Sequence, residues 1–296
     1  MYSIRVAIIT FIKNRFNQAV RNSKEIVSLK DKLNILFSQN ENNLIFQQDA
    51  ILAQNDYFLR KNKNNKKVVY TCLTGGYDDL PLHLFLNPEY DYICYTDSEK
   101  LLNYRNYGAW EIRGLEKVCE NPTLSNRWHK THPHVLFENS YTESIYIDSN
   151  IIVTGSLLFK EIEAKQNLPV VIPRHNYRNC VYKEIDEVLK TVCGILKKVN
   201  PESVLKMKNF LETNDFPKDY GLNENNIIYR KHNEPAVAKM MEDWWGFIEN
   251  YCPRDQLSLC YVLWKNNIKP DDISITNARE SNNYIVVEHK KQKRYL

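Results

Sequence analysis

The chain contains little glycine and no long hydrophobic run. Only 8 of its 296 residues are glycine, and neither glycine nor proline occurs before Gly75. The longest apolar run near the N-terminus, residues 6–12, is far shorter than the roughly 18 residues that a membrane-spanning helix needs. No small-residue cleavage site of a signal peptide follows this run. We therefore expect neither a membrane-spanning segment nor a secretory leader.

Paired cysteines and an excess of one charge are also lacking. The 7 cysteines are scattered and include no Cys-x-x-Cys pair, which argues against a zinc ribbon or a disulfide framework and predicts reduced thiols in a cytoplasmic protein. The net charge of +4 is the difference between 40 basic and 36 acidic residues. This charge falls short of the basic stripe expected of a nucleic-acid binder.

Two regions differ in pattern. Residues 1–66 predict an N-terminal helical extension that ends in a basic run, which is either a solvated linker or a contact for acidic lipid headgroups. From residue 67 to residue 296, strands alternate with helices, which predicts an α/β domain that binds ligands at the carboxyl ends of its strands. Residues 182–216 predict an inserted helical pair that covers the site.

The apolar stretch from Ile145 to Val153 contains one acid and one amide, Asp148 and Asn150. Its β-branched residues predict a buried strand, in which a lone carboxylate needs a cationic partner. In a strand, Asp148 and Asn150 point to the same side, and two oxygen ligands there suit a hard divalent cation. The alternative is a plain turn between two strands, because Asp148, Ser149 and Asn150 all favour turns.

Charged residues on two predicted helices complete the candidate site. Arg127 and Lys130 lie three residues apart and therefore share one helix face, where two cations suit a diphosphate. A solvated charge face is the alternative. Asp255 falls in the first turn of another helix, where the helix dipole stabilises an acid whether or not it takes part in chemistry.

A set of short motifs runs in order from about residue 67 to the C-terminus. The motifs are Tyr70–Asp78, Tyr92–Asp97, Arg127–Lys130 with Pro133 and His134, Ile145–Asn150, Arg178–Cys180 with Tyr182 and Glu184, Glu224–Asn226, and Arg254–Gln256. The ordered set resembles glycosyltransferases of the GT-A type. It is most similar to a family that includes plant pectin and mucilage glycosyltransferase-like proteins and bacterial polysaccharide-locus proteins.

The resemblance implies a fold and a donor site. The fold would be a GT-A-like (Rossmann-like) α/β domain whose mostly parallel sheet is flanked by helices, with a nucleotide-sugar across its C-terminal edge. The donor contacts that it implies are Thr71, Thr74, Gly75, Tyr77, Asp97, Arg127, Lys130, Asp148 and Asn150. It further implies Mn²⁺ or Mg²⁺ on Asp148, Asn150 and His289. Because Asn150 replaces the commoner second Asp, the metal would be held with less charge.

The resemblance also implies catalytic and acceptor residues. Arg127 and Lys130 would stabilise the departing diphosphate. Asp255 would be the general base of an inverting enzyme, or would orient a substrate in a retaining one. The acceptor contacts would be Arg174, His175, Arg178, Glu224 and Asn225.

We therefore predict a cytoplasmic glycosyltransferase that moves a sugar from a UDP-sugar to a saccharide or glycolipid acceptor in bacterial surface polysaccharide synthesis. Its basic segments would give a peripheral association with the inner face of the membrane. One alternative is a nucleotidyl- or phosphosugar transferase, although residues 75–78 lack the Lys or Arg of its glycine-rich loop. The other is a non-catalytic GT-A-like binding module.

Overall fold

The computed structural model describes residues 44–195 and 199–289. The strands of its main sheet are β1 (Lys67–Leu73), β2 (Tyr90–Thr96), β3 (Asn106–Tyr107), β4 (Trp110–Gly114), β5 (Glu143–Ile147), β7 (Val170–Pro173), β8 (Ile227–Arg230) and β9 (Ser274–Ile275). Their order is β3-β4-β2-β1-β5-β8-β7-β9. Within the described residues, all strands of this sheet except β3 and β8 run in the same direction. The predicted mostly parallel sheet is confirmed.

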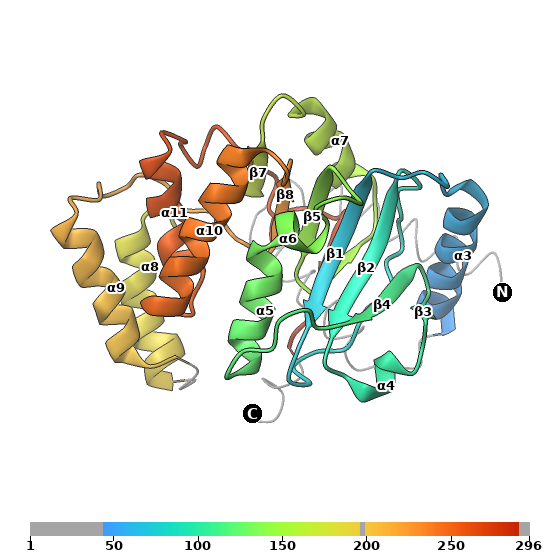
Figure 1. Cartoon of the computed structure of the whole chain (residues 1–296), viewed down its shortest axis with the longest axis horizontal. Helices are drawn as coiled ribbons and strands as arrows, with labels where there is room; N and C mark the ends of the chain where they lie inside the picture. The colour runs from blue at the N-terminus through green and yellow to red at the C-terminus, as the bar shows by residue number, and fades with distance from the viewer. Residues whose placement is uncertain (1–43, 196–198, 290–296) are drawn as a thin grey trace, which may run out of the picture.

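Helices flank this sheet. They are α3 (Leu44–Arg60), α4 (Glu99–Leu102), α5 (Pro122–Thr131), α6 (Pro133–Leu136), α7 (Leu157–Ala164), α8 (Val181–Glu187), α9 (Pro201–Thr213), α10 (Pro235–Asn250) and α11 (Gln256–Lys265). A π-helix, Val188–Ile195, follows α8, and a 3₁₀-helix, Ala278–Glu280, lies near the end of the described chain. Figure 1 shows α8, α9 and α11 grouped on the side of the molecule opposite α3.

The central strands are buried on both faces, which explains their continuous apolar runs. In β1, Val69 belongs to one apolar cluster, which also contains Tyr57 of α3 and Leu158 of α7. Its neighbours Val68 and Tyr70 belong to a second cluster, which contains apolar residues of α10. Alternate side chains of one strand thus build two separate cores.

The stretch Ile145–Val153 does not form one strand, and that prediction is wrong. β5 ends at Ile147, residues 148–150 turn, and β6 (Ile151–Val153) leaves the main sheet to pair with β10 (Tyr284–Val286). The Ile151 N–H donates to the Asp148 carbonyl at 3.0 Å. The turn preference of Asp148, Ser149 and Asn150 overrides the β-branched pattern around them. The acid therefore lies at the carboxyl end of a buried strand.

The described part of the predicted N-terminal extension is the helix α3, and residues 1–43 lie outside the described residues. α3 contacts the sheet through its inner face. The Tyr57 hydroxyl donates to the Tyr90 carbonyl at 3.0 Å, and the Gln54 side chain accepts from the Ala109 N–H at 2.7 Å. The region of the predicted insertion is helical, and its elements α8, the π-helix and α9 pack with α11 in a third apolar cluster. In the described ranges no helix is both long and apolar enough to cross a bilayer.

Candidate active site

Helix α5 places two cations at the carboxyl edge of the sheet. The Asn121 side chain caps its N-terminus by accepting from the Leu124 N–H, and the Tyr70 hydroxyl donates to the carbonyl of Lys130 at 3.1 Å. Arg127 and Lys130 face the same side of α5, as the sequence predicts. The side chain of Lys130 is 2% exposed and that of Arg127 is 20% exposed. Lys130 is therefore a buried charge, while Arg127 reaches the surface of the site.

Asp255 holds both cations. Its carboxylate lies 2.8 Å from Lys130 Nζ and 3.5 Å from a terminal guanidinium nitrogen of Arg127. The Trp244 indole donates to its carbonyl at 3.0 Å. Burial of Asp255 opposes ionisation, but Arg127, Lys130 and Arg254 outweigh it and hold the pKa of this carboxyl well below its usual range. A carboxylate with so low a pKa is a poor general base, which argues against the base role predicted for Asp255.

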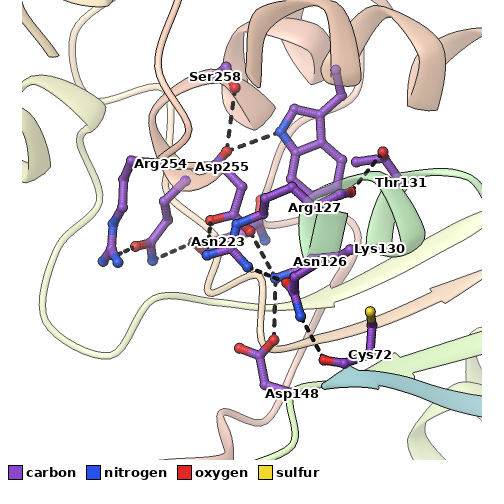
Figure 2. A network of polar contacts seen from close by, with 12 residues as sticks. Cys72, Asn126, Arg127, Lys130, Thr131, Asp148, Asn223, Arg254, Asp255 and Ser258 are labelled. Atoms are coloured by element: carbon purple, nitrogen blue, oxygen red, sulfur yellow. Dashed lines mark hydrogen bonds and ion pairs between the residues drawn. The ribbon is translucent and has the colours of Figure 1, made fainter. Parts of the chain in front are cut away.

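Asp148 is more accessible than Asp255. Its side chain is 31% exposed and lies 3.5 Å from Lys130 Nζ, a looser contact than that between Lys130 and Asp255. The Asp148 N–H donates to the Asn226 carbonyl at 2.8 Å, which ties the turn after β5 to the loop before β8. Figure 2 shows Asp148 and Asp255 approaching Lys130 from opposite sides. The buried ammonium of Lys130 thus lies between the buried carboxylate of Asp255, which contacts two cations, and the accessible carboxylate of Asp148.

The loop after β1 borders α5. Gly75 adopts φ +64°, its N–H donates to Asp97 at 2.8 Å, and a Cβ added to it would lie 2.8 Å from the Pro122 side chain. The Thr74 hydroxyl donates to the Pro122 carbonyl at 2.7 Å. Thr71 is buried in β1, and no hydrogen bond reaches its hydroxyl. Thr74 and Gly75 therefore lie against the start of α5, and Asp97 is joined to them through the Gly75 N–H.

Asn126 is a structural residue of the site that sequence reasoning missed. Its amide donates to the Cys72 carbonyl at the end of β1 at 2.6 Å and accepts from the guanidinium of Arg127 at 2.9 Å. Figure 2 shows this link between the strand and Arg127. An isolated Asn in a helix gives no sequence signal for such a role.

Each of the three predicted metal ligands contacts another residue of the chain. Asp148 contacts Lys130, whereas His289 Nδ1 lies 2.8 Å from the carboxylate of Asp78. The amide of Asn150 donates to the Val287 carbonyl at 3.0 Å. The described residues contain no group of three or more His, Cys, Asp or Glu side chains that could hold a metal ion. The set of Asp148, Asn150 and His289 therefore stays a prediction.

Tyr77 lies beside this C-terminal contact. Its ring centroid is 4.7 Å from that of His289. The hydroxyl of Ser149 donates to Asp78 at 3.1 Å. His289 therefore contacts the loop after β1, and Asp78 of that loop in turn contacts the turn after β5.

The predicted acceptor residues converge from several segments. The buried carboxylate of Glu184, on α8, lies 2.6 Å from Arg178 and 3.5 Å from Arg254. The imidazole of His175 is 3.8 Å from the same carboxylate, and burial lowers its pKa to about 4, so that it is neutral at pH 7. In the sequence, Glu184 and Arg254 stand out only as parts of the family motifs. Their contacts show that these motifs meet in one cluster.

Glu224 and Asn225 occupy the loop before β8. Glu224 pairs with Arg279, and its carboxylate accepts from Asn277 at 2.8 Å. Asn277 also donates to the Arg174 carbonyl at 2.8 Å. Asn225 is 4% exposed, and neither polar atom of its side chain has a hydrogen-bond partner. The predicted acceptor residues therefore lie in connected loops, with Asn225 still holding unused hydrogen-bonding groups.

The fold and the site together define an α/β domain with an ion-rich cluster at the carboxyl edge of its sheet. The model of the family described as TOD1/MUCI70, glycosyltransferase-like domain, matches residues 59–290. The chain belongs to this family, which confirms the resemblance seen in the sequence. No curated protein matches the chain.

Solved structures show remote similarity. The chain is 10% identical to the WbbM bifunctional glycosyltransferase, with 68% of this chain and 38% of that chain covered and a TM-score of 0.39. It is 9% identical to the glycosyltransferase GlyE of Streptococcus pneumoniae, with 73% and 46% covered and a TM-score of 0.38. Against core-mannan synthase A of Aspergillus fumigatus, described as an Mn/GDP form, the identity is 10%, the coverage 75% of each chain and the TM-score 0.38. The chain spans less than half the length of WbbM and GlyE.

Proposed function

We propose that this protein is a glycosyltransferase that moves a sugar from a nucleotide-sugar donor, a UDP-sugar, to a saccharide acceptor. Membership of a glycosyltransferase-like family supports the class. The observation that carries the proposal is the pair Arg127 and Lys130, held by Asp255 beside the accessible Asp148 at the carboxyl edge of the sheet. Ligands of α/β sheets bind at this edge.

The chemistry of transfer requires fixed positive charge. Breaking a sugar–phosphate bond leaves a diphosphate whose negative charge grows in the transition state, and preorganised cations stabilise that charge. Arg127 is partly exposed and can donate directly to phosphate oxygens, in the geometry that guanidinium groups favour. Lys130 is buried, so that it acts through its charge. Arg127 is thus the proposed direct contact and Lys130 the cation behind it.

We propose a positioning role for Asp255 in place of the base role. Its carboxylate contacts both cations and carries a lowered pKa. A fixed anion behind two cations keeps them ionised and oriented before the donor arrives, which lowers the cost of reorganisation during the reaction. Neutralising Asp255 should therefore displace the cations.

The loop after β1 is the proposed contact for the nucleoside. Gly75 brings the backbone close to α5, and Asp97 fixes its N–H. Thr71 and Tyr77 belong to the same end of β1 and the loop that follows it. Mn²⁺ or Mg²⁺ on Asp148, Asn150 and His289 stays a prediction. A place in surface polysaccharide synthesis at the inner face of a membrane is likewise part of the proposal.

Thermal unfolding with a panel of nucleotides tests this function. UDP-sugars should raise the Tm, and the shift should be lost in Asp148→Ala but retained in the matched control Asp186→Ala, which alters an exposed carboxylate on α8. Each titration is run with Mn²⁺ and with EDTA, which tests the metal separately. A shift with nucleoside triphosphates alone would favour the nucleotidyltransferase. No shift with any nucleotide would favour the non-catalytic binding module.

A further inference from the structure

Three guanidinium groups gather around two carboxylates next to the proposed donor site. Arg178 and Arg254 share Glu184, and Arg279 pairs with Glu224. The two carboxylates are joined through the backbone. Glu224 N–H donates to the Pro173 carbonyl at 2.9 Å, and the residues after Pro173 form the loop that carries Arg178. One continuous cluster results.

Burial within this cluster is uneven. The side chain of Glu184 is 3% exposed, whereas those of Arg178, Arg254 and Arg279 are 29%, 33% and 41% exposed. The carboxylate that anchors two of the guanidinium groups is thus in the interior, and the groups themselves reach solvent. His175 adds no charge, because its lowered pKa keeps it neutral. Three cations against two anions leave one positive charge unbalanced, and the exposed Arg174 adds another.

Unused hydrogen-bonding groups lie in the same place. Asn225 is 4% exposed and has no partner for either side-chain polar atom, and the side-chain oxygen of the buried Asn223 also lacks one. The buried Nε of Arg254 is likewise without a partner. Leaving such groups unpaired is costly, so that several together indicate a ligand that supplies the missing partners. The loop reaches Asp148, whose N–H donates to the Asn226 carbonyl.

We propose that this guanidinium cluster is a binding site for an anionic group on the acceptor saccharide, either a carboxylate or a phosphate. Arg178 and Arg254, oriented by Glu184, contact the anion, and the loop of Asn223 and Asn225 contacts neighbouring hydroxyl groups. The site adjoins Asp148, so that an acceptor anchored there lies beside the donor. The proposal rests on the proposed glycosyltransferase function and adds the charge of the acceptor to it.

Isothermal titration calorimetry tests the proposal on the full chain in the presence of UDP. The probes are three disaccharides that differ only in the terminal residue, which is glucose, glucuronate or glucose 6-phosphate. We expect an anionic form to bind at least about tenfold tighter than the neutral form, because hydrogen bonds between charged partners are the stronger ones. The preference should weaken as salt rises. Preference for glucuronate alone, phosphate alone or both supports the site and identifies the anion. Equal affinity for all three overturns it.

Variants connect the preference to the cluster. Arg178→Gln should reduce the anion preference about tenfold, whereas Lys183→Gln, which alters an exposed lysine on α8 that pairs with Asp219, should leave it unchanged. If Arg178→Gln does not fold, Arg254→Gln serves as the second variant, because the proposal places Arg254 on the same anion and its side chain is slightly more exposed. A preference that survives the folded variant would contradict the proposal. A titration of the wild type with UDP alone separates the two proposals. If the wild type binds UDP but shows no preference for the anionic disaccharides, only the acceptor site is refuted.

Discussion

The two aspartates that flank Lys130 occupy opposite kinds of environment. Asp255, at the start of α11, is 6% exposed and contacts two cations, with 2.8 Å to Lys130. Asp148, in the turn after β5, is 31% exposed and contacts one cation at 3.5 Å. Asp255 orients the side chains of Arg127 and Lys130 on α5. Asp148 keeps hydrogen-bonding capacity for a ligand. Folding and ligand binding thus depend on different carboxylates.

The largest expected effect on folding comes from Lys130→Met. This change leaves Asp255 buried with only the 3.5 Å contact to Arg127, and breaking a buried ion pair costs about 3–5 kcal/mol. Urea unfolding should show this loss, whereas Lys183→Met on the exposed face of α8 should cost well under about 1 kcal/mol. If both lysine variants had similar unfolding free energies, the pairing of Lys130 with Asp255 would not stabilise the fold. Asp255 would then not differ from Asp148 in this respect.

Asp255→Asn should have the next largest effect, and its size should depend on pH. The folded pKa of Asp255 lies below the unfolded value of about 3.9, so the pairing stabilises the fold above that value and the stabilisation is lost as pH falls below it. We expect the variant to be less stable by about 3 kcal/mol at pH 7 and to lose less stability than the wild type between pH 5 and pH 3. Parallel urea titrations across this range measure both. An equal loss of unfolding free energy in wild type and variant between pH 5 and pH 3 would show that Asp255 is not paired with the cations as described.

Glycine substitutions in the loop after β1 test how closely this loop, the proposed nucleoside contact, packs against α5. Gly75→Ala places a Cβ 2.8 Å from the Pro122 side chain at φ +64°, whereas Gly76→Ala meets nothing within 4 Å at φ +58°. The left-handed backbone costs about 1–2 kcal/mol in both, and the steric contact adds to it only at Gly75. The Tm of Gly75→Ala should therefore be lower than that of Gly76→Ala in thermal unfolding. The reverse order would contradict the described packing.

The smallest effect on folding should come from Asp148→Asn. Its partly exposed contact to Lys130 is worth less than about 1 kcal/mol, so urea unfolding should hardly change. Binding of a UDP-sugar should nevertheless fall, in contrast to Asp255→Asn, in which both properties decline. A strong loss of stability in Asp148→Asn would mean that the two aspartates share one structural role.

Sequence patterns predicted the local features of this site and missed its long-range pairings. Helical periodicity was sufficient to place Arg127 and Lys130 on one face, because neighbours three residues apart on a helix always share a face. Their partner Asp255 is far along the chain, and no local pattern reports a contact that the sheet topology creates. The same limit explains why the pairing of His289 with Asp78 was not foreseen.

Two further features were not predicted, one for a local reason and one for a long-range reason. The β-branched residues on both sides of Asp148 suggested a continuous strand, but three consecutive turn-forming residues end β5 and redirect β6 to another sheet. Glu184 appears in the sequence only as part of a motif, and only the position of α8 beside the loops of Arg178 and Arg254 makes it a buried partner of both arginines. Buried charges are identified by their partners, which the sequence alone does not name.

Titration calorimetry of UDP and UMP against the wild type and Arg127→Gln tests the central claim most directly, because the two nucleotides differ only in the second phosphate. The account predicts that UDP binds at least about tenfold tighter than UMP and that Arg127→Gln removes most of this difference while UMP affinity changes little. Equal binding of UDP and UMP by the wild type, or a difference that persists in Arg127→Gln, would contradict a diphosphate site at Arg127 and Lys130.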